Sequence, residues 1–488
     1  MLSKLLGISV EINKKSIVFI WDLRLRASKK NSYIRSNIAL VPYGSLDCEL
    51  QYMIIEKFLN RNIDDKYEVN YIKPFKIKSK STHTAVGPLL TYQEKLEYIH
   101  TILGDRNFDI IRGAYDEYRK DCIVSELFEK STIDTSLIDK IQYQIDLAKE
   151  IVDGNTTIVI PDIAYTKSRS IKHFSKERNK KVLVINPYGE VRDISSNEAL
   201  DPDPSAAEIH GMRLLFHKDF DIEDAATSYV KRRIAGDIVQ DLDAVRAFNK
   251  REREKLLDFT NKKVLLLHCI ADAANVPMQI RNSDDLILND YFLWTREMFR
   301  IVSKEPGQWL IKIHPASKLY PKDYQIINRL MVLFQIPTDA MIPEGCSTLE
   351  VLQSKAPIFT HSGTIALESA ALGQRAVCIT GRYGDEIALN VRSIKALENL
   401  AEKSAESLQE ILKNSSENSV LAATWLFLWR SNYEHGRVIS VKHPIQPNMG
   451  ALHYLLTQHK ICVDFYKKVL SRKFYSDFSM LIQPYFVD

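Results

Sequence analysis

The sequence has no long run of apolar residues. None of its stretches approaches the roughly 20 consecutive apolar residues that a membrane-spanning helix needs. Residues 1–8 are too short, and too soon interrupted by polar residues, to predict a signal peptide. We therefore expect a cytoplasmic protein, and a basic C-terminal tail leaves peripheral contact with the inner membrane open.

The sequence also lacks paired cysteines and an excess of charge of one sign. Its six cysteines form no C-x-x-C pair, and several lie in apolar runs, which is typical of buried thiols in a reducing compartment. With 66 basic and 62 acidic residues the net charge is +4, too small and too evenly spread to predict a nucleic acid partner. The basic clusters at 167–181 and 466–475 indicate solvated faces or, alternatively, contact with an anionic membrane surface or an acidic glycan.

Internal repeats and low-complexity tracts are also missing. What is present is an ordinary globular composition, 45% hydrophobic and 26% charged, in a chain of 488 residues. That length is too great for one core and suits two α/β domains. We therefore predict domains at 1–255 and 256–440, followed by a basic, aromatic tail at 441–488.

The first predicted domain alternates short apolar runs with longer stretches of helical periodicity. Each apolar run ends in a turn signal, as parallel strands covered on both faces do. The strands predicted are 16–21, 37–42, 156–161 and 181–186, and the helices 92–103 and 109–130 form an insertion. Asp201-Pro-Asp-Pro-Ser205 then predicts an extended loop, with a metal-ligand pair as the alternative. Polar helices follow at 221–235 and 239–257.

The second predicted domain has a clearer alternation of strands and helices. This order is typical of a doubly wound parallel sheet, so the fold class expected is α/β with two Rossmann-like domains. The predicted strands are 263–268, 309–314, 356–360 and 375–379, and the predicted helices are 288–302, 322–334, 364–372 and several within 391–432.

Polar residues follow several of these strands, where open parallel sheets bind ligands. Lys312-Ile-His-Pro315 closes one strand, and His314 there suits phosphate binding or proton donation to a leaving group, or alternatively a purely structural bond to a loop. Ser362, Gly363 and Thr364 join another strand to a helix, as a phosphate site or as an ordinary helix cap. Glu368, one turn later, is placed to accept ribose hydroxyls or to be solvated.

Two further loops complete this set. Asp272 and Asn275 follow the first strand of the domain, at the cleft edge or in an Asx turn. Arg382, in Gly381-Arg-Tyr383, offers a planar fork for a phosphate.

The order of these segments resembles bacterial capsule and surface-polysaccharide glycosyltransferases, including groups that use CMP-activated acidic sugars. The residues that carry the resemblance are Asp272, Asp290-Tyr-Phe-Leu-Trp294, Leu310–Ala316, Gly363–Glu368 and Gly381–Tyr383. It covers roughly residues 225–390; the first 200 residues resemble no family.

The resemblance implies a GT-B enzyme without metal or other cofactor, whose second domain binds a nucleotide-sugar donor. His314 and Pro315 match the family's His-Pro pair, whereas Ser362-Gly363-Thr364 replaces its Ser-Ser pair and leaves the donor open. Lys312 and Tyr383 belong to the matched donor-site segments. The partners implied are the donor and a glycan or glycolipid acceptor.

An inverting transferase also needs a base for the acceptor hydroxyl, and in GT-B enzymes the first domain usually supplies it. Asp22, directly after the strand 16–21, is the best placed carboxylate, and His83 and Asp47 are alternatives. Other functions stay open: transfer of a phospho-alditol from a CDP donor, 2-epimerisation of a sugar nucleotide, or a non-catalytic scaffold in polysaccharide assembly.

Overall fold

The computed structural model contains two compact units, each built around its own five-stranded sheet. The first unit comprises residues 1–84, 135–198 and 431–488, and the second comprises 85–134 and 199–430. The structure describes the following residues: 36–42, 52–53, 55–56, 67–72, 88–104, 106, 108–161, 165–185, 191–195, 222–235, 237, 257–270, 286–315, 317, 320–343, 346–379 and 383–436, the last nine without side chains.

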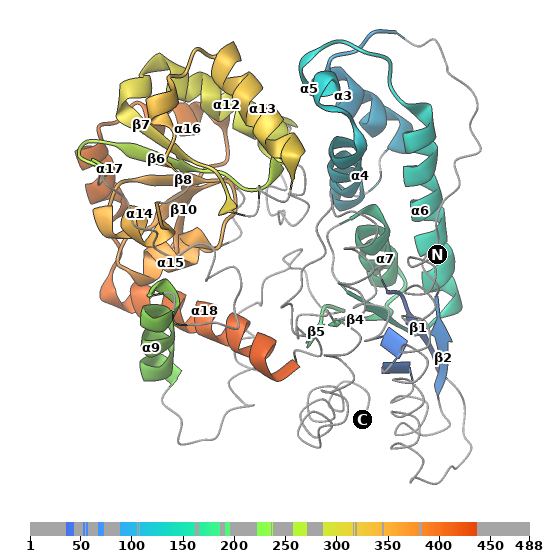
Figure 1. Cartoon of the computed structure of the whole chain (residues 1–488). Coiled ribbons are helices and arrows are strands. Elements are labelled where there is room, and N and C mark those ends of the chain that lie inside the picture. Colours follow the sequence, from blue (N-terminus) through green and yellow to red (C-terminus); the bar gives the residue numbers. More distant parts are fainter. Residues whose placement is uncertain are drawn as a thin grey trace, which may run out of the picture. The chain divides into compact units, whose positions relative to one another are not determined.

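The sheet of the first unit has the strand order β2-β1-β3-β4-β5 (Figure 1). The first four strands are parallel, and β5 pairs with β4 in the antiparallel direction. The elements of this unit are β1 (Ser36–Leu40), β2 (Tyr67–Tyr71), α6 (Thr135–Gly154), β3 (Thr157–Ile160), α7 (Thr166–Glu177), β4 (Lys181–Ile185) and β5 (Val191–Asp193).

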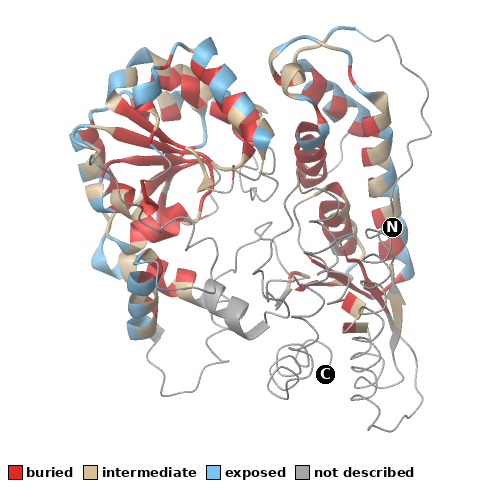
Figure 2. Cartoon of the chain, viewed as in Figure 1, coloured by how far each residue is buried: buried red, intermediate tan, exposed pale blue. Residues whose placement is uncertain are grey.

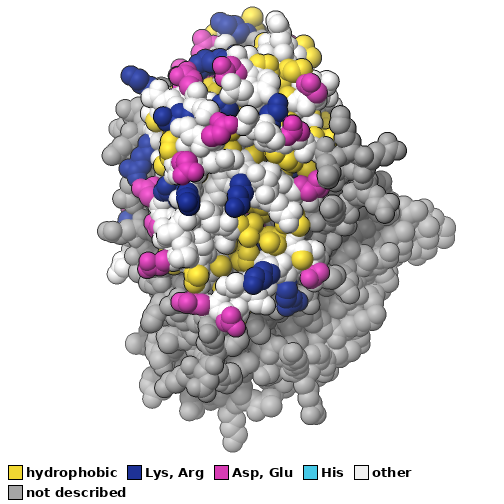
Figure 3. Space-filling model, turned by 90° about the vertical axis from the view of Figure 1, so that its left-hand side faces the viewer, with side chains coloured by type: hydrophobic (Ala, Val, Ile, Leu, Met, Phe, Trp, Pro, Cys, Tyr) yellow, Lys and Arg dark blue, Asp and Glu magenta, His cyan; other side chains and the backbone are white. Residues whose placement is uncertain are grey.

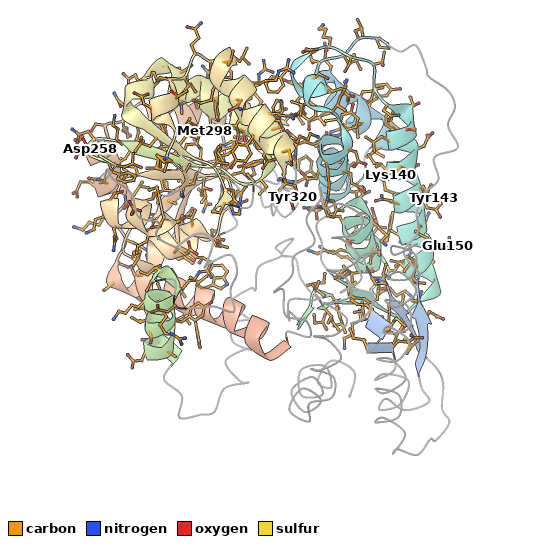
Figure 4. The ribbon with its side chains drawn as sticks, in the orientation of Figure 1. Lys140, Tyr143, Glu150, Asp258, Met298 and Tyr320 are labelled. Carbon is orange, nitrogen blue, oxygen red and sulfur yellow. The ribbon has the colours of Figure 1, made fainter. Side chains whose placement is uncertain are left out.

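The core of the first unit is aliphatic. Ile158 and Ile160 of β3, Val182 of β4 and Ile171 of α7 pack in one buried cluster, and α6 contributes its own apolar stripe. Lys140, Tyr143 and Glu150 lie along α6 in Figure 4, and Tyr143 and Glu150 are exposed. Strands buried along their whole length and amphipathic helices are what the hydrophobic pattern predicted.

The basic cluster 167–181 differs from its predicted role as a solvated face. It forms α7 and β4, and within α7 Arg169 and Lys172 are 5% and 8% exposed. The helix buries these stems because its apolar and small residues face inward on the same side.

The sheet of the second unit is entirely parallel, with the order β10-β9-β8-β6-β7. The predicted parallel sheet is thus confirmed, and each predicted strand is found within about two residues. The elements from α9 on are α9 (Ile222–Ile234), β6 (Lys263–Leu266), α11 (Leu286–Asn289), α12 (Tyr291–Lys304), η2 (Pro306–Gln308), β7 (Trp309–Lys312), α13 (Pro321–Leu333), η4 (Thr338–Ala340), α14 (Thr348–Ser354), β8 (Ile358–Thr360), α15 (Ile365–Ala371), β9 (Ala376–Cys378), β10 (Ala388–Asn390), α16 (Ile394–Ala401), α17 (Ala405–Leu412) and α18 (Ser416–Gly436).

The predicted insertion belongs to this second unit. It forms α3 (Tyr92–Leu103), α4 (Phe108–Asp121) and α5 (Val124–Phe128), which group with residues 199–430 and not with the sheet that precedes them in sequence. The division at residue 255 predicted from the sequence therefore differs from the structure, since 85–134 and the helix α9 both join the second unit. A GT-B packing of the two units stays a prediction.

Local sequence explains where several of these helices begin. Thr91 and Glu94 form a capping box at the start of α3, and Ser347 and Glu350 form another at α14. Asp290 caps α12 by accepting from the backbone N–H of Leu293 at 2.9 Å. Each cap satisfies N–H groups that the first helical turn leaves unbonded.

Burial and surface charge follow the usual pattern of a globular protein. The central strands are buried, α4 is buried on all sides from Asp109 to Arg119, and helices such as α6 bury one face (Figure 2). On the face in Figure 3, acidic and basic side chains are interspersed. Among the described helices, none is both long and apolar enough to cross a membrane.

Candidate donor site at the carboxyl edge of the second sheet

The strand order of the second sheet creates a switch point between β6 and β8. From β6 the chain continues to β7 on one side, and it then returns past β6 to place β8, β9 and β10 on the other. In open parallel sheets, ligands bind beyond the carboxyl ends of the strands at such a point. In Figure 4, Asp258 marks the amino end of β6 and Tyr320 the opposite, carboxyl edge.

Two histidines lie at this edge. His268 follows β6 and His314 follows β7, and their rings are 5.8 Å apart between centroids with an interplanar angle of 29°. Both side chains are half-buried. Because an imidazole donates hydrogen bonds and carries a positive charge when protonated, a stacked pair suits an anionic ligand.

The turn after β8 packs directly against this pair. A Cβ atom built on Gly363 would lie 3.0 Å from Nε2 and 3.1 Å from Cε1 of His268. A side chain at 363 would therefore press on the imidazole, so glycine is required here for close approach. Ser362, directly before it, is 2% exposed. The turn thus contacts His268, which in turn stacks on His314.

Thr364 occupies the N-cap position of α15, but its side chain makes no capping hydrogen bond. Its side chain accepts no bond from the helix, and it is half-buried at the same edge. The expected alternative of an ordinary helix cap is thus wrong for Thr364.

Glu368 has a different role from both predicted ones. Its side chain is 4% exposed, so it is not solvated. Its Oε1 atom accepts from Nε and Nη2 of Arg233 at 2.9 Å each, so it is engaged within the protein. Arg233 is equally buried, so the pair ties α9 to α15. A carboxylate buried this deeply needs such a partner, because desolvation of an unpaired charge is costly.

Two other predicted donor residues hold the fold. The ammonium of Lys312 donates to the carbonyl of Cys346 at 2.6 Å and is buried beneath the edge. Tyr383 is fully buried and packs edge-to-face on Trp425 of α18, with ring centroids 5.8 Å apart. Pro315 follows His314 and is half-buried, as a residue that turns the chain outward.

Much of the support of the histidine pair comes from Arg119, a residue that no motif singled out. The guanidinium of Arg119, on α4, donates from Nε to the carbonyl of Ile270 at 3.1 Å and from Nη1 to Asp290 at 3.1 Å. Its Nη2 donates to Asp116 at 2.8 Å. One buried side chain thus holds both the segment after β6 and the cap of α12.

Asp290 accepts a second hydrogen bond from the insertion. The Tyr92 hydroxyl donates to its Oδ2 at 3.0 Å, and burial, followed by the charge of Asp290, raises the pKa of Tyr92 well above its usual value. Burial alone would lower the pKa of Arg119, but Asp116 and Asp290 more than offset this and raise it. Arg119 therefore stays charged and Tyr92 stays neutral within this network.

The segment after β6 is held from other sides as well. The backbone N–H of His268 donates to the Tyr291 hydroxyl, and that of Ile270 donates to Asp323 at 3.1 Å. Lys322, beside Asp323, donates to the carbonyls of Arg119 and Lys120 at 2.9 and 3.2 Å. The C-terminal end of α4 and the start of α13 are joined in this way.

A third histidine lies behind the pair. His361 is fully buried, donates from Nε2 to the carbonyl of Leu288 at 3.2 Å, and packs edge-on against Tyr291 and Trp294. Burial, followed by the charge of Arg112, lowers its pKa well below the usual value. His361 is therefore neutral, and no described group bonds its Nδ1.

Several predicted site residues lie outside the described part of the chain. These are Asp22, Asp47, His83, Asp272, Asn275, Arg382 and the segment 201–205. Within the described residues, no group of three or more histidine, cysteine, aspartate or glutamate side chains is arranged to hold a metal ion.

Comparison with known proteins adds little to this geometry. No protein-family model matches the sequence, and no curated protein matches it. One similar solved structure is a crystal structure of a glycosyltransferase from Rickettsia africae ESF-5, which covers 91% of this chain and 100% of its own. The sequence identity is 9% and the TM-score 0.27, values at which the likeness carries no argument about fold or function.

Proposed function

We propose that this protein is a glycosyltransferase of the GT-B type that binds a nucleotide-sugar donor at the β6–β8 switch point. The observation that supports this most strongly is the convergence of His268, His314 and the Ser362-Gly363 turn at one sheet edge. They follow three neighbouring strands, at the position where open α/β sheets bind nucleotides.

The proposed roles follow from the chemistry of these groups. When His314 is protonated, its imidazolium, stacked on His268, stabilises the negative charge that develops on the departing nucleotide. Ser362 and Thr364 offer hydroxyl groups beside it, and Gly363 keeps the edge open to close approach. Because the network around Arg119 fixes the segment after β6, these groups are preorganised rather than assembled by the ligand.

The finer proposals rest on the family resemblance described above. The donor class proposed is one of nucleotide sugars that includes CMP-activated acidic sugars, and the acceptor is a bacterial surface polysaccharide or a lipid-linked glycan. Asp272 and Arg382 complete the donor site, and Asp22 is the proposed base. Transfer proceeds without a metal ion, and the basic tail at 441–488 provides any peripheral contact with a membrane.

Binding calorimetry tests the donor site directly. CMP, CDP, UDP and GDP are titrated into the full chain without added metal, and into His314→Ala. We expect one nucleotide to bind and the substitution to weaken its affinity at least about tenfold, since a charge-assisted hydrogen bond is lost. His173→Ala is the matched control, because His173 is a half-exposed histidine of α7 in the first unit.

The outcomes separate the candidate functions. A preference for CDP over CMP favours transfer of a phospho-alditol instead of a sugar. If the folded protein binds none of the four nucleotides, the donor-site proposal is wrong and the scaffold alternative replaces it. Equal loss of affinity in His314→Ala and His173→Ala also contradicts the assignment, because the effect is then not specific to this edge.

A further inference from the structure

A cysteine lies beside the histidine pair. Cys269 directly follows His268, and its sulfur atom is 3.5 Å from Nδ1 of His314. The Ser317 hydroxyl lies 3.7 Å from the same sulfur. Cys269 is half-buried, so part of the residue is exposed to solvent.

The backbone that carries this thiol is held by buried polar groups on both sides. Ile270 donates to Asp323 and accepts from Arg119, both at 3.1 Å, and these side chains are 0% and 1% exposed. The N–H of His268 is bonded by Tyr291, which is also fully buried. The short distance from sulfur to imidazole is therefore built into the fold and does not depend on a loose surface side chain.

The other described cysteines have different surroundings. Cys122, Cys346 and Cys378 are 6%, 2% and 0% exposed. Burial raises the pKa of Cys122 to about 11, which keeps it a neutral thiol at physiological pH. Structural thiols of this kind are inert, whereas a thiol that is accessible and adjacent to a histidine is reactive.

We propose that Cys269 is a reactive thiol, activated by His314, and that its covalent modification blocks the donor site. The reactivity stands on the geometry alone. The second half, the block of donor binding, rests on the proposed function. The reagents are of two chemical classes: soft alkylating electrophiles and low-molecular-weight disulfides.

The chemistry balances in both cases. The Cys269 thiol transfers its proton to Nδ1 of His314, and the imidazolium stabilises the thiolate. With a disulfide, the thiolate attacks one sulfur, a new S–S bond forms as the old one breaks, and the departing thiolate takes the proton. With iodoacetamide, a C–S bond forms and iodide leaves. The added group then occupies the space beside His314.

Alkylation followed by peptide mass spectrometry tests the reactivity of each cysteine separately. The full chain is treated with iodoacetamide at pH 7 for a series of times, as wild type, His314→Gln and the control His173→Gln. We expect Cys269 to react at least about tenfold faster than Cys122, Cys346 and Cys378, and His314→Gln to slow it about tenfold. The effect of His314→Gln shrinks at pH 9.5, where the thiol ionises without help. His173→Gln leaves the rate unchanged.

Two results overturn the reactivity. One is a rate at Cys269 no higher than that of the buried cysteines in the folded wild type. The other is an equal rate in wild type and His314→Gln at pH 7, which shows that the histidine does not activate the thiol.

The block of the site is tested with glutathione disulfide. Protein carrying the mixed disulfide at Cys269 is expected to lose at least about tenfold in affinity for the nucleotide that binds the wild type, and dithiothreitol restores it. Unchanged affinity in the modified protein overturns the block. If Cys269 reacts rapidly while no nucleotide binds or protects it, the proposed donor site fails and the reactive thiol stands.

Discussion

The two sheets share one strand order but differ in the chemistry at their carboxyl edges. If the strands of each sheet are numbered from one to five in chain order, so that β6 is the first strand of the second sheet, both sheets have the order 2-1-3-4-5. The fifth strand is antiparallel only in the first sheet. In the first sheet, the described residues that follow β1 and β3 are Val41, Pro42 and Pro161. In the second sheet, the corresponding strands are followed by His268 and by His361, Ser362 and Gly363.

This difference shows that the strand order provides a place where a ligand can bind, whereas the side chains at that place decide whether one does. The first sheet is stabilised by an aliphatic cluster around Ile158. The second adds buried charges at its edge, around Arg119 and Asp290. Buried charges stabilise the fold less per group than apolar packing does. Their hydrogen bonds, however, hold neighbouring groups in one orientation, and a binding site needs groups with fixed orientations.

The largest effect is expected from Arg119→Met, which removes the side chain that joins the insertion to the second sheet. Asp290 and Asp116 then lose the buried guanidinium that both accept from, at a cost of about 3–5 kcal/mol in the free energy of unfolding. Urea unfolding followed by tryptophan fluorescence measures it, because Trp294 and Trp309 are both buried in this unit.

A matched control exists for Arg119→Met. Arg329 of α13 also pairs with the insertion, through Glu129, but both side chains are exposed, at 42% and 61%. Arg329→Ala should cost less than about 1 kcal/mol. Similar losses in the two variants would mean that burial does not distinguish these contacts, and the contrast between the edges would lose its basis.

A smaller effect is expected from Gly363→Ala, which tests whether the two strand ends of the second sheet are in close contact. The new methyl group lies 3.0 Å from the His268 ring, which must shift by a few tenths of an ångström. We expect a loss of about 1–3 kcal/mol in stability and weaker nucleotide binding. Gly307→Ala is the control, because no atom lies within 4 Å of its added Cβ. Equal behaviour of the two variants contradicts the close packing.

The smallest effect concerns pH and the neutral His361. Its pKa is lowered in the folded chain, by burial first and by Arg112 next, with His268 and Arg119 adding to the shift. The unfolded chain therefore binds a proton that the folded chain does not. The contribution of neutral His361 to the free energy of unfolding is fully present above about pH 6.5. Below that pH it falls by about 1.4 kcal/mol per pH unit. His361→Phe removes this component, as unfolding at pH 7 and 5 would show.

The first sheet offers the comparison for this pH effect. Ile158→Val removes one buried methylene group and should cost about 0.5–1.5 kcal/mol at both pH values. A wild-type slope that persists unchanged in His361→Phe would assign the pH dependence to other groups.

Local patterns in the sequence predicted the elements well. The strand 263–268 and the histidine at 314 are visible because apolar runs of four to six residues ended by a polar residue describe a buried strand and its exit. The capped helix starts and the parallel order follow from similar short-range rules. His314, Ser362 and Gly363 were predicted as one site; in the structure His268 lies between them, stacked on His314 and next to Gly363, and a common ligand site stays a prediction.

Long-range pairs could not be predicted from one sequence. Glu368 is paired with Arg233, 135 residues away, and nothing near either residue indicates the other. Arg119 lies in a stretch predicted only as part of a helical insertion, and its partner Asp290 was named only within the resemblance segment 290–294. His268 was seen only as the end of a strand, because its stacking on His314 depends on the order of strands in the sheet.

The assignment of the insertion to the second unit has a consequence during synthesis of the chain. Arg119 and Asp290 are separated by 171 residues, so the ribosome completes α4 roughly 10–30 s before the cap of α12 emerges. During that interval Tyr92 of α3 and Arg119 of α4 lack their buried partner Asp290. Nascent chains are then open to chaperones and to misassembly, and slow codons between residues 134 and 290 would lengthen this exposure.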